Sequence, residues 1–398
     1  MGITTPFSKR ELMPQEEKLD IRKKRGKLFI GIPKENFKIE QRICLTPEAV
    51  NMLVTYGHKV LIESGAGTHA SYTDKEYSEA GAQITQDPNK VFSCPIILKV
   101  EPPTLEEIAL MKAKTYLFSA IQLKTQKKEY FQALAKKKIT ALCYEFIKDR
   151  EGAYPFLQAI SEIAGIASIH IAAEYMTKCN DGKGLLFGNI TGVPPTEVVI
   201  IGAGTVAEFA ARTALGLGAN VKVFDNSIHK LKNLQRVLPY RIFTSTIQEK
   251  VLLKSLMRCD VAIGAIRGAS RSPIIVSETM VERMKGGAVV IDVCIDNGGC
   301  FETSEATTHE NPIKTKYNVV HYGVPNITSR YSKTATLAIS NIISPYLLEL
   351  SENGGLENAL EYDKAIRSGV YMYQGILVNQ QIGEWYGLDY KDINLFVL

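Results

Sequence analysis

The middle of the chain contains Val198-Val199-Ile200-Ile201-Gly202-Ala203-Gly204-Thr205-Val206-Ala207. Its run of β-branched residues is typical of a buried parallel strand, and residues 208–215 continue in a helical pattern. Between them, Gly202 permits a tight turn, Gly204 lets a pyrophosphate approach the backbone, and Ala207 is small enough for the helix to pack on the sheet. This Gly-x-Gly-x-x-Ala motif, set between a strand and a helix, predicts a dinucleotide-binding site.

An acidic residue follows at the distance that such a site requires. Asp225 ends the next β-rich run, Val221-Lys222-Val223-Phe224-Asp225. Its carboxylate can accept hydrogen bonds from an adenosine ribose diol and would repel a 2′-phosphate, so NAD is favoured over NADP. The diphosphate is expected on the free N–H groups at the positive end of the helix dipole.

The composition excludes several classes of protein. At 398 residues the chain is long for one core, and hydrophobic residues at 45% with charged residues at 22% are globular values. The net charge of +5 is modest and basic residues are scattered apart from residues 22–27, so nucleic acid is not an expected partner. The seven cysteines are dispersed without zinc-like spacing to the six histidines, which predicts reduced thiols, no metal and a cytoplasmic protein.

No segment predicts membrane insertion. The first seven residues lack a signal-peptide core, and the longest uncharged run, residues 334–348, is too short to span a bilayer and contains Pro345. We therefore expect a soluble protein without a membrane partner.

The rest of the chain alternates between strand and helix patterns. Thr46 and Pro47 predict the start of a first helix, and further helices are expected over residues 105–111 and 127–136. Strands are expected over residues 28–33, 59–63, 96–100, 115–121 and 139–144. This alternation predicts a parallel sheet covered by helices.

A long apolar helix pattern from Glu162 to Met176 leads to the dinucleotide motif and is expected to join two domains. Strands over 260–265, 288–293 and 319–322 complete the second sheet, and a helix over 333–350 returns to the first domain. The predicted fold is α/β, with two Rossmann-like doubly wound parallel-sheet domains and the active site in the cleft between them. The expected parts are a substrate domain (1–160), an NAD-binding domain (161–330) and C-terminal helices that return to the substrate domain (331–398).

Polar residues at strand ends are the candidates for chemistry, because ligands of open α/β sheets bind there. Arg42 precedes the first helix, whereas Lys99 and Gln122 end apolar strands. An arginine can clamp a carboxylate and a lysine can polarise a carbonyl. Arg42 and Lys99 equally fit structural salt bridges, and Gln122 fits a solvated position.

Two further polar residues lie in the second half. Asp296 follows a buried strand and can order water or an amine near a nicotinamide, but it also fits a turn that closes Asp296-Asn297-Gly298-Gly299. His321 lies on a strand and fits a hydrogen-bonded core position better than a site.

Several ordered motifs together resemble a known family. They are Gly31-Ile32-Pro33-Lys34-Glu35, Gln41-Arg42-Ile43-Cys44-Leu45-Thr46-Pro47, Leu98-Lys99-Val100-Glu101-Pro102, Ser161-Glu162-Ile163-Ala164-Gly165, Gly202-Ala203-Gly204 and Ile291-Asp292-Val293-Cys294-Ile295-Asp296. Running from about Leu28 to about Glu352, they are similar to the alanine dehydrogenase and transhydrogenase alpha-subunit family, most of all to alanine dehydrogenases. The resemblance implies two Rossmann-like domains in a homo-oligomer, either a dimer or a hexamer.

The resemblance also implies an activity and roles for individual residues. The activity would be NAD-dependent, reversible oxidative deamination of L-alanine to pyruvate and ammonia, so that an amino acid and a 2-oxo acid are the small-molecule partners. Arg42 and Lys99 would hold the substrate carboxylate and carbonyl, Asp296 would assist water or ammonia, and Asn326 would contact substrate or nicotinamide. On the cofactor side, the implied contacts are Gly202, Gly204, Ala207, Asp225, Lys230, Ile266, Asp296 and Asn326.

The chain departs from the family at three places. Gln122, in Ile121-Gln122-Leu123, replaces the histidine that serves the family as acid–base catalyst. Its amide can hydrogen-bond the substrate at the catalytic site but cannot shuttle a proton near neutral pH. The loop 266–273 lacks the family's Pro-Gly-Ala-Lys-Ala-Pro run, and Asn326-Ile327-Thr328 replaces Asn-Met-Pro. Either Lys99, Asp296 or a water molecule would serve as the acid–base group in place of the histidine, or activity is low. Lys99 can serve in this role if burial lowers its pKa from about 10.4 toward neutrality.

Three functions remain open at this point. An amino-acid dehydrogenase leads, because Arg42, Lys99 and Asp296 are all retained. A transhydrogenase alpha-type subunit that passes hydride to a second nucleotide-binding chain is the alternative within enzymes. A catalytically weak NAD-binding sensor is the alternative of another class, motivated by Gln122.

Overall fold

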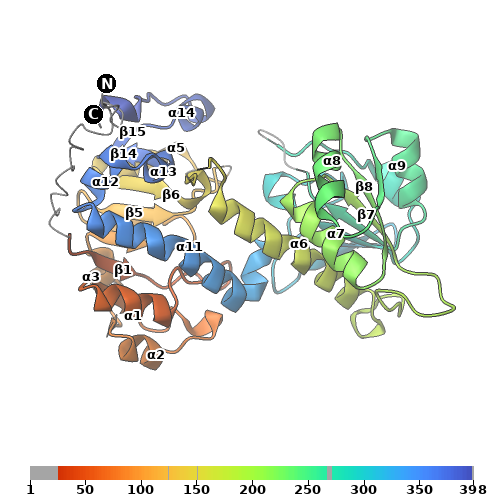
Figure 1. Ribbon diagram of the computed structural model, residues 1–398, viewed down its shortest axis with the longest axis horizontal. Coiled ribbons are helices and arrows are strands. Elements are labelled where there is room, and N and C mark those ends of the chain that lie inside the picture. The colour runs from red at the N-terminus through yellow and green to blue at the C-terminus, as the bar shows by residue number, and fades with distance from the viewer. Residues whose placement is uncertain (1–25, 124, 150, 267–270, 397–398) are drawn as a thin grey trace, which may run out of the picture.

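A computed structural model describes residues 26–123, 125–149, 151–266 and 271–396. Two lobes, each built on one β-sheet, lie side by side and are bridged by the long helices α6 (Pro155–Tyr175) and α11 (Ser332–Glu352) (Figure 1). The segment before residue 26 and residues 267–270 of the expected loop departure lie outside the described residues.

The sheet of the first lobe has the strand order β15-β14-β6-β5-β4-β1-β2-β3. The pairs from β6 to β3 are parallel, whereas β14 pairs antiparallel with both β6 and β15. The segment after α11 therefore contributes two strands at one side of this sheet, with β15 at the edge, as well as helices. The strands are β1 (Phe29–Ile32), β2 (Lys59–Glu63), β3 (Gln83–Thr85), β4 (Ile96–Leu98), β5 (Tyr116–Ser119), β6 (Thr140–Cys143), β14 (Val370–Tyr373) and β15 (Ile376–Leu377).

Short helices cover this sheet. The predicted start of the first helix is confirmed, because the Thr46 side chain accepts a hydrogen bond from the Ala49 N–H and Pro47 occupies the first turn. The helices are α1 (Pro47–Thr55), α2 (Asp74–Glu79), α3 (Pro88–Phe92), α4 (Leu105–Leu110), α5 (Lys128–Lys136), α12 (Leu356–Tyr362), α13 (Lys364–Gly369) and α14 (Gln380–Tyr386), with 3-10 turns η1 (Thr68–Ala70), η2 (Tyr144–Phe146) and η6 (Ile393–Leu395).

The sheet of the second lobe has the order β12-β13-β11-β10-β7-β8-β9. All its pairs are parallel except β12 with β13. The chain leaves β7 to one side for β8 and β9 and returns to the other side for β10, which creates the topological switch point where such sheets bind ligands. The strands are β7 (Glu197–Ile201), β8 (Asn220–Phe224), β9 (Phe243–Ser245), β10 (Val261–Gly264), β11 (Val289–Asp292), β12 (Ile313–Lys316) and β13 (Val319–Tyr322).

Helices and 3-10 turns complete the second lobe and its junction with the first. The helices are α7 (Thr205–Gly216), α8 (Ile228–Val237), α9 (Glu249–Leu256) and α10 (Glu278–Glu282), and the 3-10 turns are η3 (Lys178–Asn180), η4 (Ile295–Asn297) and η5 (Ile327–Tyr331).

Both sheets are buried on two faces, as the apolar runs predict. In β4, Ile96 and Leu98 pack into one hydrophobic core and Ile97 into another on the opposite face. In β7, Val198 and Ile200 face one core, and Val199 and Ile201 face another. Alternation along each strand thus supplies both layers of helices with apolar contacts.

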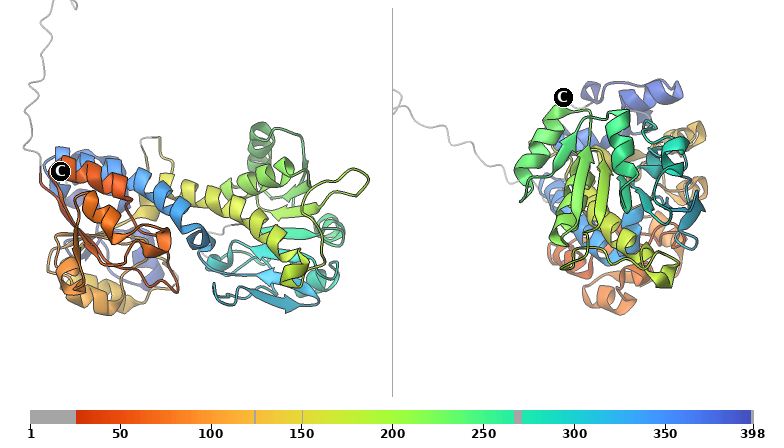
Figure 2. Two further views of the ribbon diagram at one scale, coloured as in Figure 1. Left: turned by 90° about the horizontal axis from the view of Figure 1, so that it is seen from below. Right: turned by 90° about the vertical axis from the view of Figure 1, so that its right-hand side faces the viewer.

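The junction of the lobes depends on α6, which α11 packs against (Figure 2). Helix α6 also packs tightly on α7: a Cβ built on Gly165 would lie 2.5 Å from the Val206 carbonyl oxygen. By length and composition α6 could cross a membrane. In this structure its apolar side chains pack inside the fold, against α7 and α11.

The predicted fold class is confirmed, because both lobes are α/β with mostly parallel sheets and covering helices. The antiparallel strands β12, β14 and β15 were not predicted. They are short, and their pairing depends on partners far along the chain or across a turn. The division at residues 160 and 330 stays a prediction.

Candidate active site

The start of α7 presents a cradle of backbone N–H groups. Gly202 has φ of +111°, and a Cβ there would lie 2.3 Å from the Ala265 carbonyl oxygen, so this turn requires glycine. Gly204 precedes α7 with no side-chain cap, and a Cβ on it would meet nothing within 4 Å. Ala207 is fully buried in the helix that follows. The protein alone therefore does not explain the glycine at 204, whereas the approach of a diphosphate would.

Asp225 lies beside this cradle at the end of β8. One carboxylate oxygen accepts a hydrogen bond from the Ala203 N–H at 2.8 Å, and the other accepts one from the Ser227 N–H at 2.7 Å. Each oxygen keeps a second lone pair that a ribose hydroxyl can use. Lys230 is exposed in the first turn of α8, and Ile266 follows β10 close to Gly202. The nucleotide contacts of these residues stay predictions.

A second group of polar residues forms a hydrogen-bonded network where the lobes meet. Arg42, between β1 and α1, pairs with Glu40 through its Nε at 2.7 Å and its Nη2 at 2.5 Å. Its Nη1 donates to Thr328 at 3.0 Å, and its Nη2 also donates to Asn326 at 2.7 Å. Burial lowers the pKa of Arg42, but the Glu40 carboxylate outweighs it and the net pKa rises. The guanidinium stays charged.

These bonds limit Arg42 as a clamp. Among the contacts of the described residues, the four just given use all its N–H groups except one on Nη1. A substrate carboxylate can accept that remaining hydrogen bond directly. A two-pronged grip would require Asn326 or Glu40 to move.

Asn326 connects the network. It precedes η5 with φ of +56°, a left-handed conformation that asparagine tolerates. Its Nδ2 donates to Glu40 at 2.7 Å and approaches Glu101 at 3.4 Å, while its backbone N–H donates to Asp296 at 3.2 Å. Asn326 thus joins residues of the first lobe to Asp296 of the second.

Glu101 and Gln122 complete the network. The Gln122 Nε2 donates to Glu101 Oε2, and Gln122 itself has φ of +46° after β5. Burial, together with the negative charge of Glu40, raises the pKa of Glu101 to about 8 despite the opposing charge of Arg42. The carboxyl group is therefore mostly protonated at neutral pH.

Lys99 follows β4 directly, as predicted, and its ammonium lies in an ion-pair cluster. Its ammonium is 3% exposed and pairs with Glu35 at 3.1 Å and Glu107 at 2.9 Å. Burial alone lowers the pKa of Lys99, but the two carboxylates outweigh it and raise the pKa above its ordinary value. The expected fall toward neutrality is wrong, and the salt-bridge alternative describes the contacts that the structure shows.

Asp296 lies in η4, directly after β11. Its side chain is accessible to solvent, yet the protein around it raises its pKa to about 6 by desolvation, against the hydrogen bond from the Asn326 N–H. Above that pH it is an anion able to orient water or ammonium.

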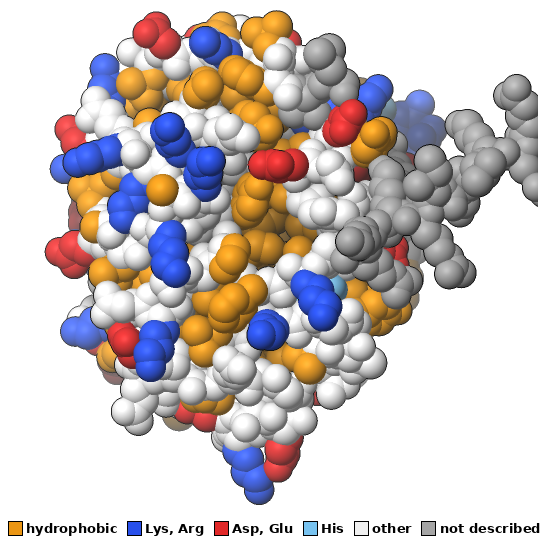
Figure 3. Space-filling view, turned by 90° about the vertical axis from the view of Figure 1, so that its left-hand side faces the viewer, with side chains coloured by type: hydrophobic (Ala, Val, Ile, Leu, Met, Phe, Trp, Pro, Cys, Tyr) orange, Lys and Arg blue, Asp and Glu red, His pale blue; other side chains and the backbone are white. Residues whose placement is uncertain are grey.

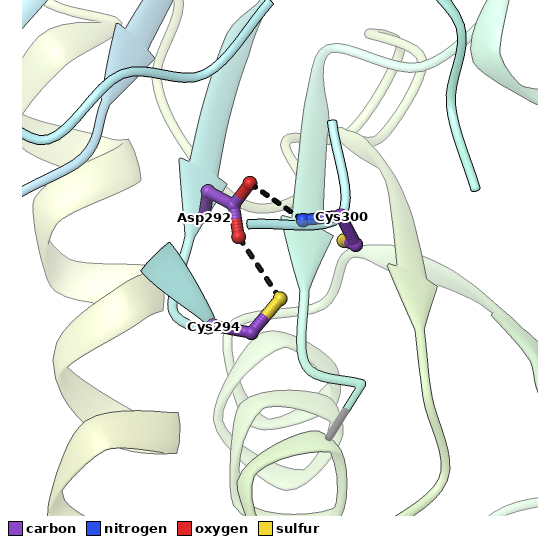
Figure 4. Close-up of side chains that lie close together, drawn as sticks. All are labelled: Asp292, Cys294 and Cys300. Atoms are coloured by element: carbon purple, nitrogen blue, oxygen red, sulfur yellow. Dashed lines mark hydrogen bonds between the residues drawn. The ribbon is translucent and has the colours of Figure 1, made fainter. Parts of the chain in front are cut away.

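The loop that carries Asp296 is held by a buried cluster of Asp292, Cys294 and Cys300, whose side chains turn toward one another (Figure 4). Asp292 accepts hydrogen bonds from the Cys294 thiol at 3.0 Å and from the N–H groups of Cys300 at 3.0 Å and Phe301 at 3.2 Å. The spacing of the cysteines did not suggest this cluster. Because these donors already satisfy the carboxylate, it serves as the acceptor that closes the turn.

The structure brings Arg42, Gln122, Asp296 and Asn326 into one network and places the Lys99 ammonium between Glu35 and Glu107. The sequence reasoning missed Glu40 and Glu101. Both lie two residues from a residue that was singled out, in Glu40-Gln41-Arg42 and Lys99-Val100-Glu101, so the signal was present. His321 bonds Thr303 at 2.8 Å and the Val319 carbonyl at 3.0 Å, which is the expected core role.

Comparison with known proteins identifies the family. The family models "Alanine dehydrogenase/PNT, N-terminal domain" and "Alanine dehydrogenase/PNT, C-terminal domain" match residues 31–164 and 168–380. Alanine dehydrogenase 2 of Staphylococcus aureus (strain USA300) is 36% identical over 366 residues, which are 92% of this chain and 98% of that protein.

Solved structures agree. An L-alanine dehydrogenase matches with a TM-score of 0.85 and 35% identity, over 90% of this chain and 99% of that one. A transhydrogenase from Sinorhizobium meliloti matches with a TM-score of 0.75 at 22% identity, over 89% and 99% of the two chains, which shows a shared fold. The chain belongs to the alanine dehydrogenase/PNT family.

Proposed function

We propose that the protein is an NAD-dependent alanine dehydrogenase, which oxidatively deaminates L-alanine to pyruvate and ammonia and runs in reverse. The observation that carries the proposal is 36% identity to an alanine dehydrogenase over 92% of the chain. The union of Arg42, Asp296 and Asn326 in one network supports it.

The α7 cradle fits NAD. Gly202, Gly204 and the free N–H groups of α7 would hold the diphosphate, and Asp225 with Lys230 would face the adenosine ribose. Ala207 would keep the helix close to the sheet, and Ile266 would line the site beside Gly202. When bound, NAD supplies the ring that accepts two electrons from the substrate.

The protein's own groups orient the substrate. Arg42 would bind its carboxylate through the free N–H, at a site that the Glu40 carboxylate keeps fixed. Asn326 would place the substrate between Arg42 and Asp296. Asp296 would order water for attack on the imine carbon, or ammonium in the reverse direction.

The experiment that tests this proposal also distinguishes it from two other functions. A transhydrogenase-type subunit would bind NADH and pass hydride to a partner chain, and a sensor would bind NADH without chemistry. The likeness to the transhydrogenase shows the fold alone.

The experiment follows NADH absorbance with ammonia and a panel of 2-oxo acids: pyruvate, glyoxylate, 2-oxobutyrate and 2-oxoglutarate. Each assay has a control without ammonia, and NADH binding is measured separately by fluorescence. Ammonia-dependent turnover with pyruvate as the best acid is expected. Tight NADH binding without turnover on any acid would overturn the proposal in favour of the other two functions.

We also propose a homo-oligomer, a dimer or a hexamer, in the cytoplasm. Exposed hydrophobic side chains support association: Figure 3 shows them as a band down the end of the first lobe, with lysines and arginines beside it. Light scattering coupled to gel filtration gives the mass, and a monomer across the working concentration range would contradict the oligomer.

A further inference from the structure

We propose that Glu101 is the acid–base group of the deamination, the residue that accepts a proton from the attacking water and returns it to the leaving nitrogen. This inference rests on the proposed function. It is carried by the position of the Glu101 carboxyl group between Gln122 and Asn326, in the network that also holds Arg42 and Asp296.

The position is built on both sides of the carboxyl group. The Gln122 amide donates to Oε2, and the Asn326 amide lies 3.4 Å from Oε1. Gln122 itself has φ of +46° and lies three residues after the end of β5. The amide that cannot carry a proton thus holds a carboxyl group that can.

Glu40 and Glu101 are two carboxyl groups with opposite environments. Burial raises the pKa of Glu40, but Arg42 outweighs it, so the net pKa is lowered and Glu40 stays ionised. Glu101 has no such partner of its own, so burial, together with the nearby Glu40 charge, raises its pKa to about 8. Carboxyl groups whose pKa values are pushed apart in this way mark acid–base pairs in enzymes. The charged and titratable groups that act on Glu101 from neighbouring segments are Glu35, Glu40 and Arg42.

The other candidates fit the role less well. The Lys99 ammonium has its pKa raised by Glu35 and Glu107, so it does not release a proton near neutral pH. Asp296, with a pKa of about 6, is a weaker base than Glu101 and is less able to take a proton from the attacking water. Gln122 does not titrate.

The step balances with the Glu101 carboxylate as base. After the substrate has lost hydride and become an iminium ion, water attacks its carbon, a C–O bond forms, and the C=N π electrons return to nitrogen. A water proton passes to Glu101, which leaves a neutral carbinolamine and a neutral carboxyl group. Glu101 then protonates the nitrogen, the C–N bond breaks with its electrons on nitrogen, and the hydroxyl proton leaves on ammonia as the C=O bond forms.

The test compares wild type with Glu101→Gln, Glu101→Asp and the control Glu106→Gln. Glutamine matches a protonated glutamate in shape but cannot titrate. Its single carbonyl oxygen can accept from Gln122 or from Asn326, but not from both in their present orientations. Glu106 is exposed in the first turn of α4, so Glu106→Gln removes a charge nearby without touching the network. Initial rates in both directions are measured at saturating substrate from about pH 6 to pH 10, with NADH affinity measured alongside.

We expect Glu101→Gln to lower kcat by about 10²–10⁴-fold with little change in NADH affinity. Wild-type kcat for deamination should rise with pH through a midpoint near 8, the reverse reaction should fall through it, and Glu101→Gln should lack both limbs. Glu101→Asp should recover part of the rate, and Glu106→Gln should match wild type. A Glu101→Gln enzyme with kcat within about three-fold of wild type and the same pH profile would overturn the inference.

Infrared spectroscopy separates this inference from the proposed function. If wild type deaminates no amino acid, the proposed function fails. If wild type is active and only the role of Glu101 is wrong, the kinetics above show it. Without any turnover, a protonated carboxyl band at neutral pH that vanishes above about pH 8 and in Glu101→Gln shows that the group titrates as described, and its absence contradicts the inference directly.

Discussion

Lys99 and Glu101 are two residues apart, but only Glu101 joins the network that holds Arg42 and Asn326. The lysine is sealed between Glu35 and Glu107, whereas the glutamate joins Arg42, Gln122 and Asn326. At this scale the decisive quantity is which ionised partner each side chain meets. Burial alone would neutralise both residues, and partners decide which one keeps its charge.

Replacing Lys99 should therefore lower the stability of the folded protein. Lys99→Ala leaves Glu35 and Glu107 without their buried cation, which costs about 3–5 kcal/mol when one member of such a pair is lost. Urea unfolding measures this loss in the free energy of unfolding, and Lys112→Ala, at an exposed lysine, is the matched control. A Lys99→Ala protein that is as stable as wild type but inactive would return Lys99 to the chemistry.

Asp225 should set the choice of cofactor. Asp225→Ala removes the acceptor for a ribose diol and the charge that repels a 2′-phosphate, so the ratio of the NADPH and NADH dissociation constants should fall by about ten-fold or more. Fluorescence titration of both cofactors measures the ratio. Because Asp225 also accepts from Ala203 and Ser227, weaker binding of both cofactors with an unchanged ratio would mean that it only shapes the turn.

At the scale of elements, two glycines at the start of α7 should affect stability and cofactor binding differently. Gly204→Ala places its methyl group in open space, so the free energy of unfolding should change by less than about 0.5 kcal/mol while NADH affinity falls. Gly202→Ala, with φ of +111° and a carbonyl 2.3 Å away, should lower stability as well. Calorimetry and NADH titration of both variants measure the two quantities. Unchanged NADH affinity in Gly204→Ala would remove the diphosphate from this cradle.

The contact between α6 and α7 is the other element-scale constraint. Gly165→Ala should destabilise the protein by about 1–3 kcal/mol, because its methyl group would lie 2.5 Å from the Val206 carbonyl oxygen. Gly216→Ala, at the end of α7 with nothing within 4 Å, is the matched control and should be neutral or slightly stabilising. Equal midpoints of thermal unfolding for the two variants would show that α6 and α7 separate without cost.

At the scale of the molecule, the network between the lobes makes stability depend on pH. An unfolded glutamate titrates near 4.3, whereas Glu101 titrates at about 8 in the fold. Between these values the folded protein holds a proton that the unfolded chain has lost. The free energy of unfolding therefore falls as pH rises, by at most about 1.4 kcal/mol per pH unit from this group, and less where solvent screens it.

Glu101→Gln removes this dependence. Its free energy of unfolding relative to wild type should grow from about pH 5 to about pH 8 and then stay constant, since the other titrating groups are common to both proteins. Urea unfolding at a series of pH values measures the difference. A difference that does not vary with pH would show that Glu101 titrates normally.

Local sequence determined most of the fold. The apolar runs of β4, β7 and β11, the Thr46 cap and the Gly202 turn are set by side-chain periodicity and backbone sterics within a few residues, so they were predictable. The antiparallel strands β12, β14 and β15 were not predictable, because short strands acquire their stability from partners elsewhere in the chain.

The candidate site, too, was predictable only in part. Polar residues that end or follow buried strands are few, and they identified Lys99, Gln122, Asp225 and Asp296 as candidates from the sequence. Arg42 was identified in the segment before the first helix. Only the tertiary structure decided which carboxylate meets which cation: Glu40 with Arg42, Glu35 and Glu107 with Lys99, and Glu101 with neither. Charge state depends on partners a few ångströms away in space and far apart in sequence, and no pattern along the chain encodes those distances.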